Sequence, residues 1–143
     1  MTELEVTGPG SGLHENGKEA EYRIGFCLVP EFSSLAFISA IEPLRLANRV
    51  AGRLIYEWYC FSEDGEPVTS SAGLVFPVAG KLSDIPALHT LFVCGGLNIQ
   101  SHSTPPVIAA LRKAASWGTA IGAICTATYI LAKSGMMKDH RGT

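Results

Sequence analysis

Four short segments of this chain combine apolar and β-forming residues without a regular polar alternation. They are YRIGFCLV (22–29), LIYEWYCFS (54–62), TLFVCGG (90–96) and TAIGAI (119–124). A strand of this kind offers no face to water, so it has to be covered on both faces. Helical patterns lie between these segments. Apolar strands that alternate with amphipathic helices predict an α/β fold, a three-layer and mostly parallel doubly wound sheet.

The first helix is expected from Ser33 to Arg49. Ser33 is a good N-cap residue, and Gly52 ends the pattern. The apolar side chains that fall on roughly one face of this helix are Leu35, Ile38, Ile41 and Leu46. Pro43 lies inside the pattern and has no N–H group, so we expect the helix to kink or to restart there.

Two further helices are expected on the carboxyl side of the chain. Thr104 is placed to cap a helix that has a proline at its first position, which is a favoured site for that residue. The last helix is expected at 126–134, after the fourth strand. The segment VTSSAGLVFPV (68–78) predicts a short edge hairpin, and KLSDIPALH (81–89) predicts a short turn or helix.

Length and composition limit the possible functions. The chain has 143 residues, enough for one domain, and its 13 acidic and 11 basic residues give no sign of a basic surface for nucleic acid. No apolar run approaches the roughly 20 residues that a membrane span requires. Residues 1–21 are polar and rich in glycine, which predicts a flexible lead before a single domain at 22–143.

The cysteines and histidines show neither the pattern of a disulfide-bonded domain nor the spacing of a metal site. The four cysteines contain no C-x-x-C pair, and no two histidines have the spacing of metal ligands. Cys27, Cys60 and Cys94 lie within or at the end of predicted strands, as reduced and buried cysteines do. The sequence therefore predicts neither disulfides nor a metal site, and it implies no cofactor.

Three loops are expected to meet at one edge of the predicted sheet. Ligands of doubly wound folds bind at the carboxyl ends of the strands. The loops that follow the first, third and fourth apolar strands are 30–34, 95–101 and 125–126. The candidate binding site is therefore expected where these three loops come together.

Cys125 stands where the fourth strand meets the last helix. Ala123 and Ala127 lie two residues before and two residues after it. Small residues are needed at these positions in a nucleophile elbow, because the sharp turn brings them close together. The alternative is a fourth buried and unreactive cysteine, and the pattern favours the elbow.

Four stretches carry a resemblance to known proteins. In order they are FCLVPEFSSLAFISAIEPLRLANRVAGR, YCFSEDGEPVTSSAGL, LFVCGG and IGAICTATYILAKSGMM. They resemble the ThiJ/PfpI superfamily, which implies a flavodoxin-like fold of the class I glutamine amidotransferase type. EPLRLAN together with GAICTATYILAKSG resembles, more narrowly, the N-terminal domain of AraC-type transcriptional regulators. The resemblance covers residues 22–143.

Enzymes of this superfamily use the elbow cysteine as the nucleophile, with an acidic residue early in the first helix and often a histidine directly after the cysteine. In this chain Thr126 follows Cys125, and Ala36 stands near the acidic position. Glu42 lies about one and a half turns further along the helix. His102 lies in a polar loop and matches no motif. A nucleophile without a base is weak evidence for catalysis, so no catalytic residue is expected.

The resemblance therefore implies a pocket kept for binding a small metabolite. The residues expected to contact it are Phe32, Ser33, Gly95, Gly96, Cys125 and Thr126. Regulators of this kind often govern the catabolism of amino acids or of quaternary amines such as betaine and carnitine. The alternative is a cysteine-dependent ThiJ/PfpI-type enzyme, such as a hydrolase, an amidase or a glyoxalase-like hydratase, with Cys125 as its nucleophile.

The resemblance also carries expectations about partners. Relatives continue beyond the position of Thr143 with the rest of this domain and then with a helix-turn-helix module of AraC type. DNA binding is expected through that further part alone. We also expect a bacterial cytoplasmic protein that forms a homo-oligomer and has no membrane partner.

Overall fold

The computed structural model describes residues 19–142, so the predicted lead at 1–21 lies almost entirely outside it. The chain forms three α-helices and seven strands within the described residues. In chain order the elements are β1 (Tyr22–Leu28), α1 (Ser34–Ala51), β2 (Tyr56–Ser62), β3 (Val68–Thr69), β4 (Val75–Phe76), β5 (Gly80–Lys81), a 3₁₀ turn (Leu82–Asp84), β6 (Thr90–Cys94), α2 (Pro105–Ser116), β7 (Ala120–Ile124), a second 3₁₀ turn (Cys125–Ala127) and α3 (Thr128–Lys133).

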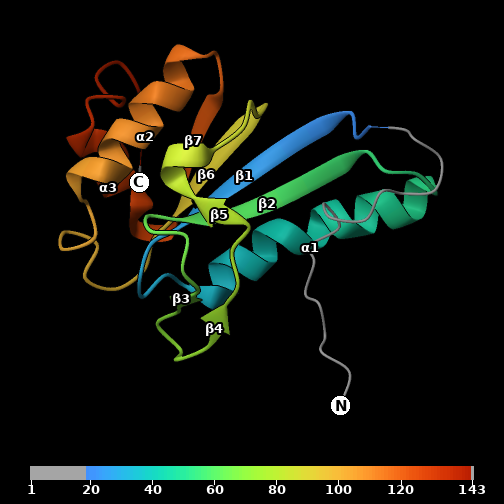
Figure 1. Cartoon of the computed structure of the whole chain (residues 1–143), viewed down its shortest axis with the longest axis horizontal. Helices are drawn as coiled ribbons and strands as arrows, with labels where there is room; N and C mark the ends of the chain where they lie inside the picture. The colour runs from blue at the N-terminus through green and yellow to red at the C-terminus, as the bar shows by residue number, and fades with distance from the viewer. Residues whose placement is uncertain (1–18, 143) are drawn as a thin grey trace.

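Five strands form one parallel sheet in the order β5-β2-β1-β6-β7. Helix α1 covers one face of this sheet, and α2 and α3 cover the other (Figure 1). Each face has its own apolar core, built around Phe26, Phe32 and Phe37 on the α1 side and around Leu91, Leu111 and Ile130 on the α2 side. The predicted three-layer, doubly wound α/β fold is therefore confirmed.

Helix α1 begins and ends where the sequence predicts, but it does not restart at Pro43. The Ser33 hydroxyl accepts a hydrogen bond from the Ala36 N–H group at 3.2 Å, which is the expected N-cap. Gly52 ends the helix in the left-handed conformation with φ 64°. Pro43 is exposed, and one helix runs through it. Water can reach the carbonyl group that proline leaves without a donor, so an unbroken helix is tolerated there.

The predicted buried face of α1 is wrong for most of its residues. Leu35, Ile38 and Leu46 are exposed, and of the four predicted residues only Ile41 packs against the core. The side chains that face the sheet are instead those of Phe37, Ala40, Ile41 and Leu44. These residues also recur at three- and four-residue steps, so the segment carries two apolar stripes and periodicity alone does not say which one meets the sheet.

Three smaller expectations are also corrected. Thr104 does not cap α2 with its side chain, because its hydroxyl donates to the Glu63 carboxylate at 3.1 Å. The hairpin of β3 and β4 is a separate two-stranded sheet rather than an edge of the main one. Residues Gly80–Lys81, at the start of the predicted short turn, add β5 as a parallel edge strand beside β2.

Within residues 19–142, every helix is too short or too polar to cross a lipid bilayer.

Candidate functional site

The site lies where the strand order changes direction. From β1 the chain passes through α1 to β2 on one side, and β6 and β7 lie on the other side. The carboxyl ends of β1 and β6 lie at this point, which is where ligands bind in doubly wound sheets. The loops that follow these two strands and the start of α1 lie at this edge of the sheet (Figure 1).

The three loops predicted to meet are brought together by hydrogen bonds. The Ser33 N–H group donates to the Gly95 carbonyl at 2.9 Å, and Phe32 and Gly96 form an isolated antiparallel bridge. The Thr126 hydroxyl donates to the Gly96 carbonyl at 2.7 Å. Residues from the ends of β1, β6 and β7 thus form one connected structure.

The two glycines are required by the closeness of these loops. A Cβ atom on Gly95 would lie 2.7 Å from the Ala127 nitrogen and 2.8 Å from the Thr126 hydroxyl oxygen. A Cβ atom on Gly96 would overlap the Glu31 carbonyl oxygen. The Gly95 N–H group is also occupied, since it donates to the Ile124 carbonyl at 3.2 Å. The main role of the two glycines is therefore to let the loops after β1, β6 and β7 pack closely against one another.

Cys125 has the backbone conformation of an elbow. Its φ angle is 60°, a left-handed value that is uncommon for residues other than glycine, and its side chain is exposed. Its surroundings differ from those of the other three cysteines. Burial raises the pKa of the Cys27 and Cys60 thiols to about 12 and raises that of Cys94 as well. The alternative of a fourth buried cysteine does not hold.

Two of the predicted ligand contacts have side chains that are already engaged. Phe32 is fully buried, and its ring packs edge-on against Phe37 and Phe76 at centroid distances of 5.6 and 5.1 Å. The Ser33 hydroxyl is the N-cap of α1. These two side chains stabilise the loop after β1 and are not free to contact a ligand. Among the predicted contacts, the exposed side chains are those of Cys125 and Thr126.

Glu31 is the site residue that the sequence reasoning missed. It lies three residues beyond the end of β1 and has φ 62°, so its backbone is left-handed, like those of Cys125 and of Asn98 (φ 50°). Its carboxylate accepts hydrogen bonds from the Asn98 side chain at 3.0 and 3.2 Å and lies 2.9 Å from His102 Nε2. An acidic residue at the carboxyl end of a buried strand was the available signal.

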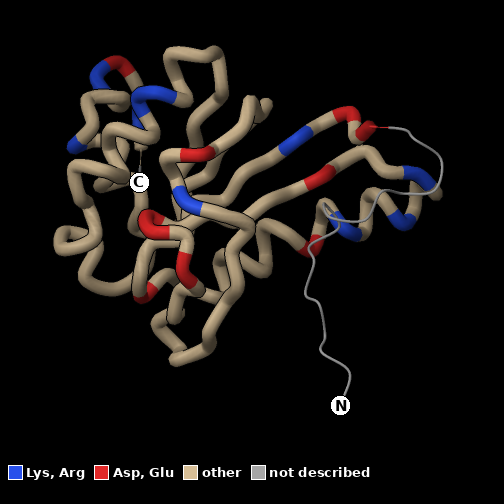
Figure 2. Tube along the Cα trace, viewed as in Figure 1, with Lys and Arg blue, Asp and Glu red and all other residues tan. Residues whose placement is uncertain are grey.

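These hydrogen bonds hold the Glu31 group ionised. His102 first, and then Asn98, lower the pKa of the Glu31 carboxyl below its usual value of 4.5. More acidic residues lie after β2, at Glu63, Asp64 and Glu66. Figure 2 shows acidic segments gathered at this end of the sheet, whereas the basic residues of α1 lie toward the far end of that helix.

Removal of His102 is expected to raise the pKa of Glu31 toward 4.5, because the largest of its stabilising interactions is lost. Since the folded-state pKa is depressed, the ionised network stabilises the fold above pH 4.5, and this contribution disappears as the pH falls through the folded-state pKa. NMR titration of the Glu31 side-chain carboxyl carbon in the parent and in His102→Ala measures the shift. Asn98→Ala should give a smaller shift, and equal pKa values in all three proteins would contradict the described network.

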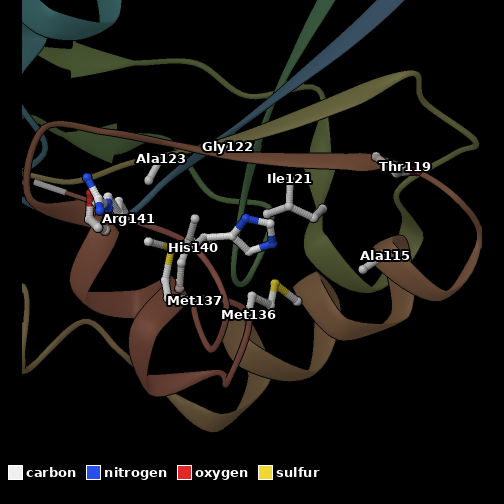
Figure 3. Close-up of a pocket in the computed structure, with 12 residues that line it drawn as sticks. Ala115, Thr119, Ile121, Gly122, Ala123, Met136, Met137, His140 and Arg141 are labelled. Carbon is white, nitrogen blue, oxygen red and sulfur yellow. The ribbon is translucent and has the colours of Figure 1, made fainter.

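A separate hollow of about 610 Å³ lies against β7, at the side of the sheet that carries α3. Its walls are of mixed polarity, and Met136, Met137 and His140 lie across the hollow from Ile121 and Gly122 (Figure 3). None of the six predicted contacts is among the described residues that line it. The hollow is therefore separate from the place where the loops after β1, β6 and β7 meet, which we call the loop junction. The described residues that form the hollow include no cluster suited to a metal.

The profile of the DJ-1/PfpI family matches residues 22–143. The chain belongs to the DJ-1/PfpI family. A left-handed cysteine after β7, beside a glycine pair that follows β6, agrees with the elbow expected for a ThiJ/PfpI domain.

Transcriptional regulators of the DJ-1/PfpI family are similar to this chain. The HTH-type transcriptional regulator GbdR from Pseudomonas aeruginosa is 40% identical over 118 residues, which are 82% of this chain and 32% of the regulator. The crystal structure of an AraC family transcriptional regulator from Pseudomonas putida matches with a TM-score of 0.71 and 30% identity, covering 83% of this chain and 64% of that one. The chain thus spans about a third of the length of the curated regulator.

The DJ-1/PfpI family also includes enzymes. The isonitrile hydratase of Pseudomonas putida is 25% identical over 122 residues, which are 85% of this chain and 51% of the enzyme. Family membership alone therefore does not separate binding from catalysis.

Proposed function

We propose that residues 22–142 are the effector-sensing part of an AraC-type transcriptional regulator. The observation that carries this proposal is the contact made by Thr126. Enzymes of the superfamily often have a histidine next to the elbow cysteine, whereas Thr126 here uses its hydroxyl to join the elbow to Gly96. This residue connects two loops rather than supplying a base. The similarity to HTH-type regulators supports the same conclusion.

The effector is a small metabolite bound at the loop junction. Cys125 and Thr126 offer exposed polar groups, Gly95 and Gly96 allow the three loops to pack closely together, and Phe32 and Ser33 hold the loop after β1 in place. The Glu31 carboxylate adds a fixed negative charge. An amino acid or a quaternary amine carries the positive group that such a carboxylate attracts. The proposed regulator would thus govern the catabolism of one of these compounds.

DNA is bound, in this proposal, by a helix-turn-helix module elsewhere in a longer polypeptide, because the regulators that resemble this chain are more than twice its length. The module and this domain act in the bacterial cytoplasm. Effector binding at the loop junction would alter the start of α1, because Ser33 both caps that helix and bonds to Gly95. Ser33 therefore connects the proposed effector site directly to helix α1.

Two substitutions at Cys125 test the site. Cys125→Ser should leave effector affinity within a few-fold, because serine keeps the size and polarity of the side chain. Cys125→Phe should weaken binding by at least about tenfold, since the large ring would occupy the exposed surface at position 125 where the effector is proposed to bind. A bulky residue at φ 60° also costs about 1–3 kcal/mol of stability. Calorimetry with amino acids, betaine and carnitine measures the affinities, and thermal unfolding measures the stability.

If neither substitution changed the affinity, the proposal that the effector contacts Cys125 would be wrong. If the panel produced neither heat nor a thermal shift with the unsubstituted protein, the sensing role itself would lose its support. A variant at an exposed site away from the junction, Trp117→Ala, serves as the matched control and should change nothing.

A cysteine-dependent enzyme is the second candidate function, and one observation favours it. Glu31 and His102 form a carboxylate–imidazole pair at the same edge of the sheet as Cys125, and such a pair can orient a general base. Assays of turnover on methylglyoxal and simple amides, run on the same variants, distinguish the two functions. Turnover that disappears in Cys125→Ser while binding survives would establish the enzyme and reject the sensor.

A further inference from the structure

Asn98 and His102 form a pair of hydrogen-bond donors that is directed at one carboxylate. The Asn98 side-chain nitrogen donates to both carboxylate oxygens of Glu31, at 3.0 and 3.2 Å, and His102 Nε2 lies 2.9 Å from one of them. An ionised carboxylate can only accept hydrogen bonds, so the proton of this last contact belongs to Nε2. Amide and imidazole N–H groups bind the carboxylate of a ligand through hydrogen bonds of the same kind.

The two donors are held in place by their own loop and not by Glu31. The Asn98 carbonyl accepts a hydrogen bond from the Ser101 N–H group at 2.9 Å, and the Ile99 carbonyl accepts one from the His102 N–H group at 3.2 Å. Asn98 has φ 50°, a left-handed value that asparagine adopts more readily than most residues. We therefore expect both donors to keep their positions when the Glu31 side chain leaves them.

The Glu31 side chain can be reached from solvent and can turn without moving its loop. The exposed fraction of this side chain is 40%, and that of His102 is 19%. The Glu31 backbone is fixed separately, because its N–H group donates to the Thr69 carbonyl at 2.9 Å and its carbonyl accepts from the Leu97 N–H group at 3.0 Å. Within residues 19–142, the lysine and arginine side chains that form ion pairs are bonded to other carboxylates. A cationic group of a ligand would therefore not compete with them for Glu31.

We propose that a zwitterionic effector exchanges with the Glu31 carboxylate, so that its own carboxylate takes the hydrogen bonds of Asn98 and His102 while Glu31 turns to its cationic group. This inference rests on the proposed effector-sensing function and assigns the residues that recognise each end of the ligand. The exchange lies within the loop junction, because Gly96 touches the Glu31 carbonyl oxygen on one side and accepts the hydrogen bond of Thr126 on the other.

The exchange requires a ligand with both charges. A ligand with the carboxylate alone would replace one carboxylate by another, and it would leave Glu31 without a donor beside a like charge. A ligand with the cationic group alone would leave Asn98 and His102 without an acceptor once Glu31 had turned away. A zwitterion gives every group an opposite partner, so the site discriminates against both kinds of half-charged molecule.

Calorimetry with betaine and two half-charged analogues tests the exchange. In tert-butylacetate a carbon atom replaces the betaine nitrogen, which gives an anion of nearly the same shape, whereas choline keeps the trimethylammonium group and has no carboxylate. The parent chain should bind betaine at least about tenfold more tightly than either analogue. In Glu31→Ala the preference for betaine over tert-butylacetate should fall to about threefold or less, because the anion gains vacant donors and binds more tightly than to the parent. Alanine, propionate and ethylamine form the same set for an amino-acid effector.

The donors are tested in the Glu31→Ala background. Adding His102→Ala should remove the gained affinity for tert-butylacetate, whereas adding His102→Gln keeps an N–H donor and should retain part of it. Glu63→Ala is the matched control, since it removes another carboxylate that accepts a hydrogen bond, from Thr104 at 3.1 Å. This control should leave every affinity within about twofold of the parent. Circular dichroism verifies that the variants are folded.

Acetate tests the donors without any effector. In NMR spectra of the side-chain amides, about millimolar acetate should shift the Asn98 Nδ2 signals of Glu31→Ala and leave those of the parent unchanged, because Glu31 occupies the donors in the parent. Absence of this shift, or a preference for the zwitterion that Glu31→Ala leaves intact, would overturn the exchange even if the parent binds betaine. A parent that binds no member of either set would overturn the proposed function, and the exchange with it.

Discussion

Replacing Gly96 with alanine is expected to lower the free energy of unfolding by about 3 kcal/mol and to abolish effector binding. A Cβ atom at this position would overlap the Glu31 carbonyl oxygen and would lie 2.8 Å from the Ser33 nitrogen. Both neighbours are backbone atoms, so no side-chain rotation can relieve the overlap. The loops after β1 and β6 would have to separate, and the Ser33–Gly95 hydrogen bond would break.

Gly80→Ala is the matched control for this effect. Gly80 lies in β5, and an added Cβ atom would have no heavy atom within 4 Å. Its substitution should change the stability by no more than about 0.5 kcal/mol. Urea unfolding measures both variants, and calorimetry measures their effector affinity. If Gly96→Ala were as stable as Gly80→Ala and still bound effector, the loops would not be as closely packed as described.

Phe32→Ala is expected to be the most destabilising single substitution considered, with a loss of about 3–5 kcal/mol. The Phe32 ring is fully buried and packs against Phe37 of α1 and Phe76 of β4, so its removal leaves a cavity among three elements. Small domains have total stabilities of about 5–15 kcal/mol, so this loss is a large share of the whole. Chemical unfolding measures it directly.

Leu35→Ala provides the comparison for Phe32→Ala. Leu35 is only three residues further along the chain, but its side chain is largely exposed. Its removal should cost no more than about 0.5 kcal/mol in the monomer. Phe32→Leu keeps most of the buried volume and should lose less stability than Phe32→Ala. A small effect of Phe32→Ala would mean that the ring is not part of the core and is free to contact the effector, as the sequence predicted.

The Glu31 cluster illustrates why part of the site could not be predicted. Glu31, Asn98 and His102 come from two loops that are some seventy residues apart, and no motif relates their spacing. Only the parallel pairing of β1 with β6 brings the loops together. In the sequence, Glu42 and His102 are separate acidic and basic residues with no spacing that relates either of them to Cys125. In the structure, Glu42 pairs with Arg45 on the side of α1 that faces away from the sheet.

The orientation of α1 is a second feature that could not be predicted from the sequence. Leu35, Ile38 and Leu46 follow a helical period, and the sequence placed them toward the sheet. Phe37, Ala40 and Leu44 follow the same period on the opposite side. Two stripes of similar hydrophobicity satisfy the same local pattern, so the choice between them depends on which one fills the space beside Phe26 and Phe32.

By itself, the sequence determined the kind and order of the main elements, the parallel sheet covered on both faces, the edge where the loops meet and the elbow at Cys125. These follow from local features, because apolar runs, caps and small residues restrict the backbone near them. Only the tertiary structure decided which side of α1 is buried, that Phe32 and Ser33 are structural supports, and that Glu31 is held by His102 and Asn98. Those outcomes depend on packing and hydrogen bonding between segments far apart in the chain, which local pattern does not encode.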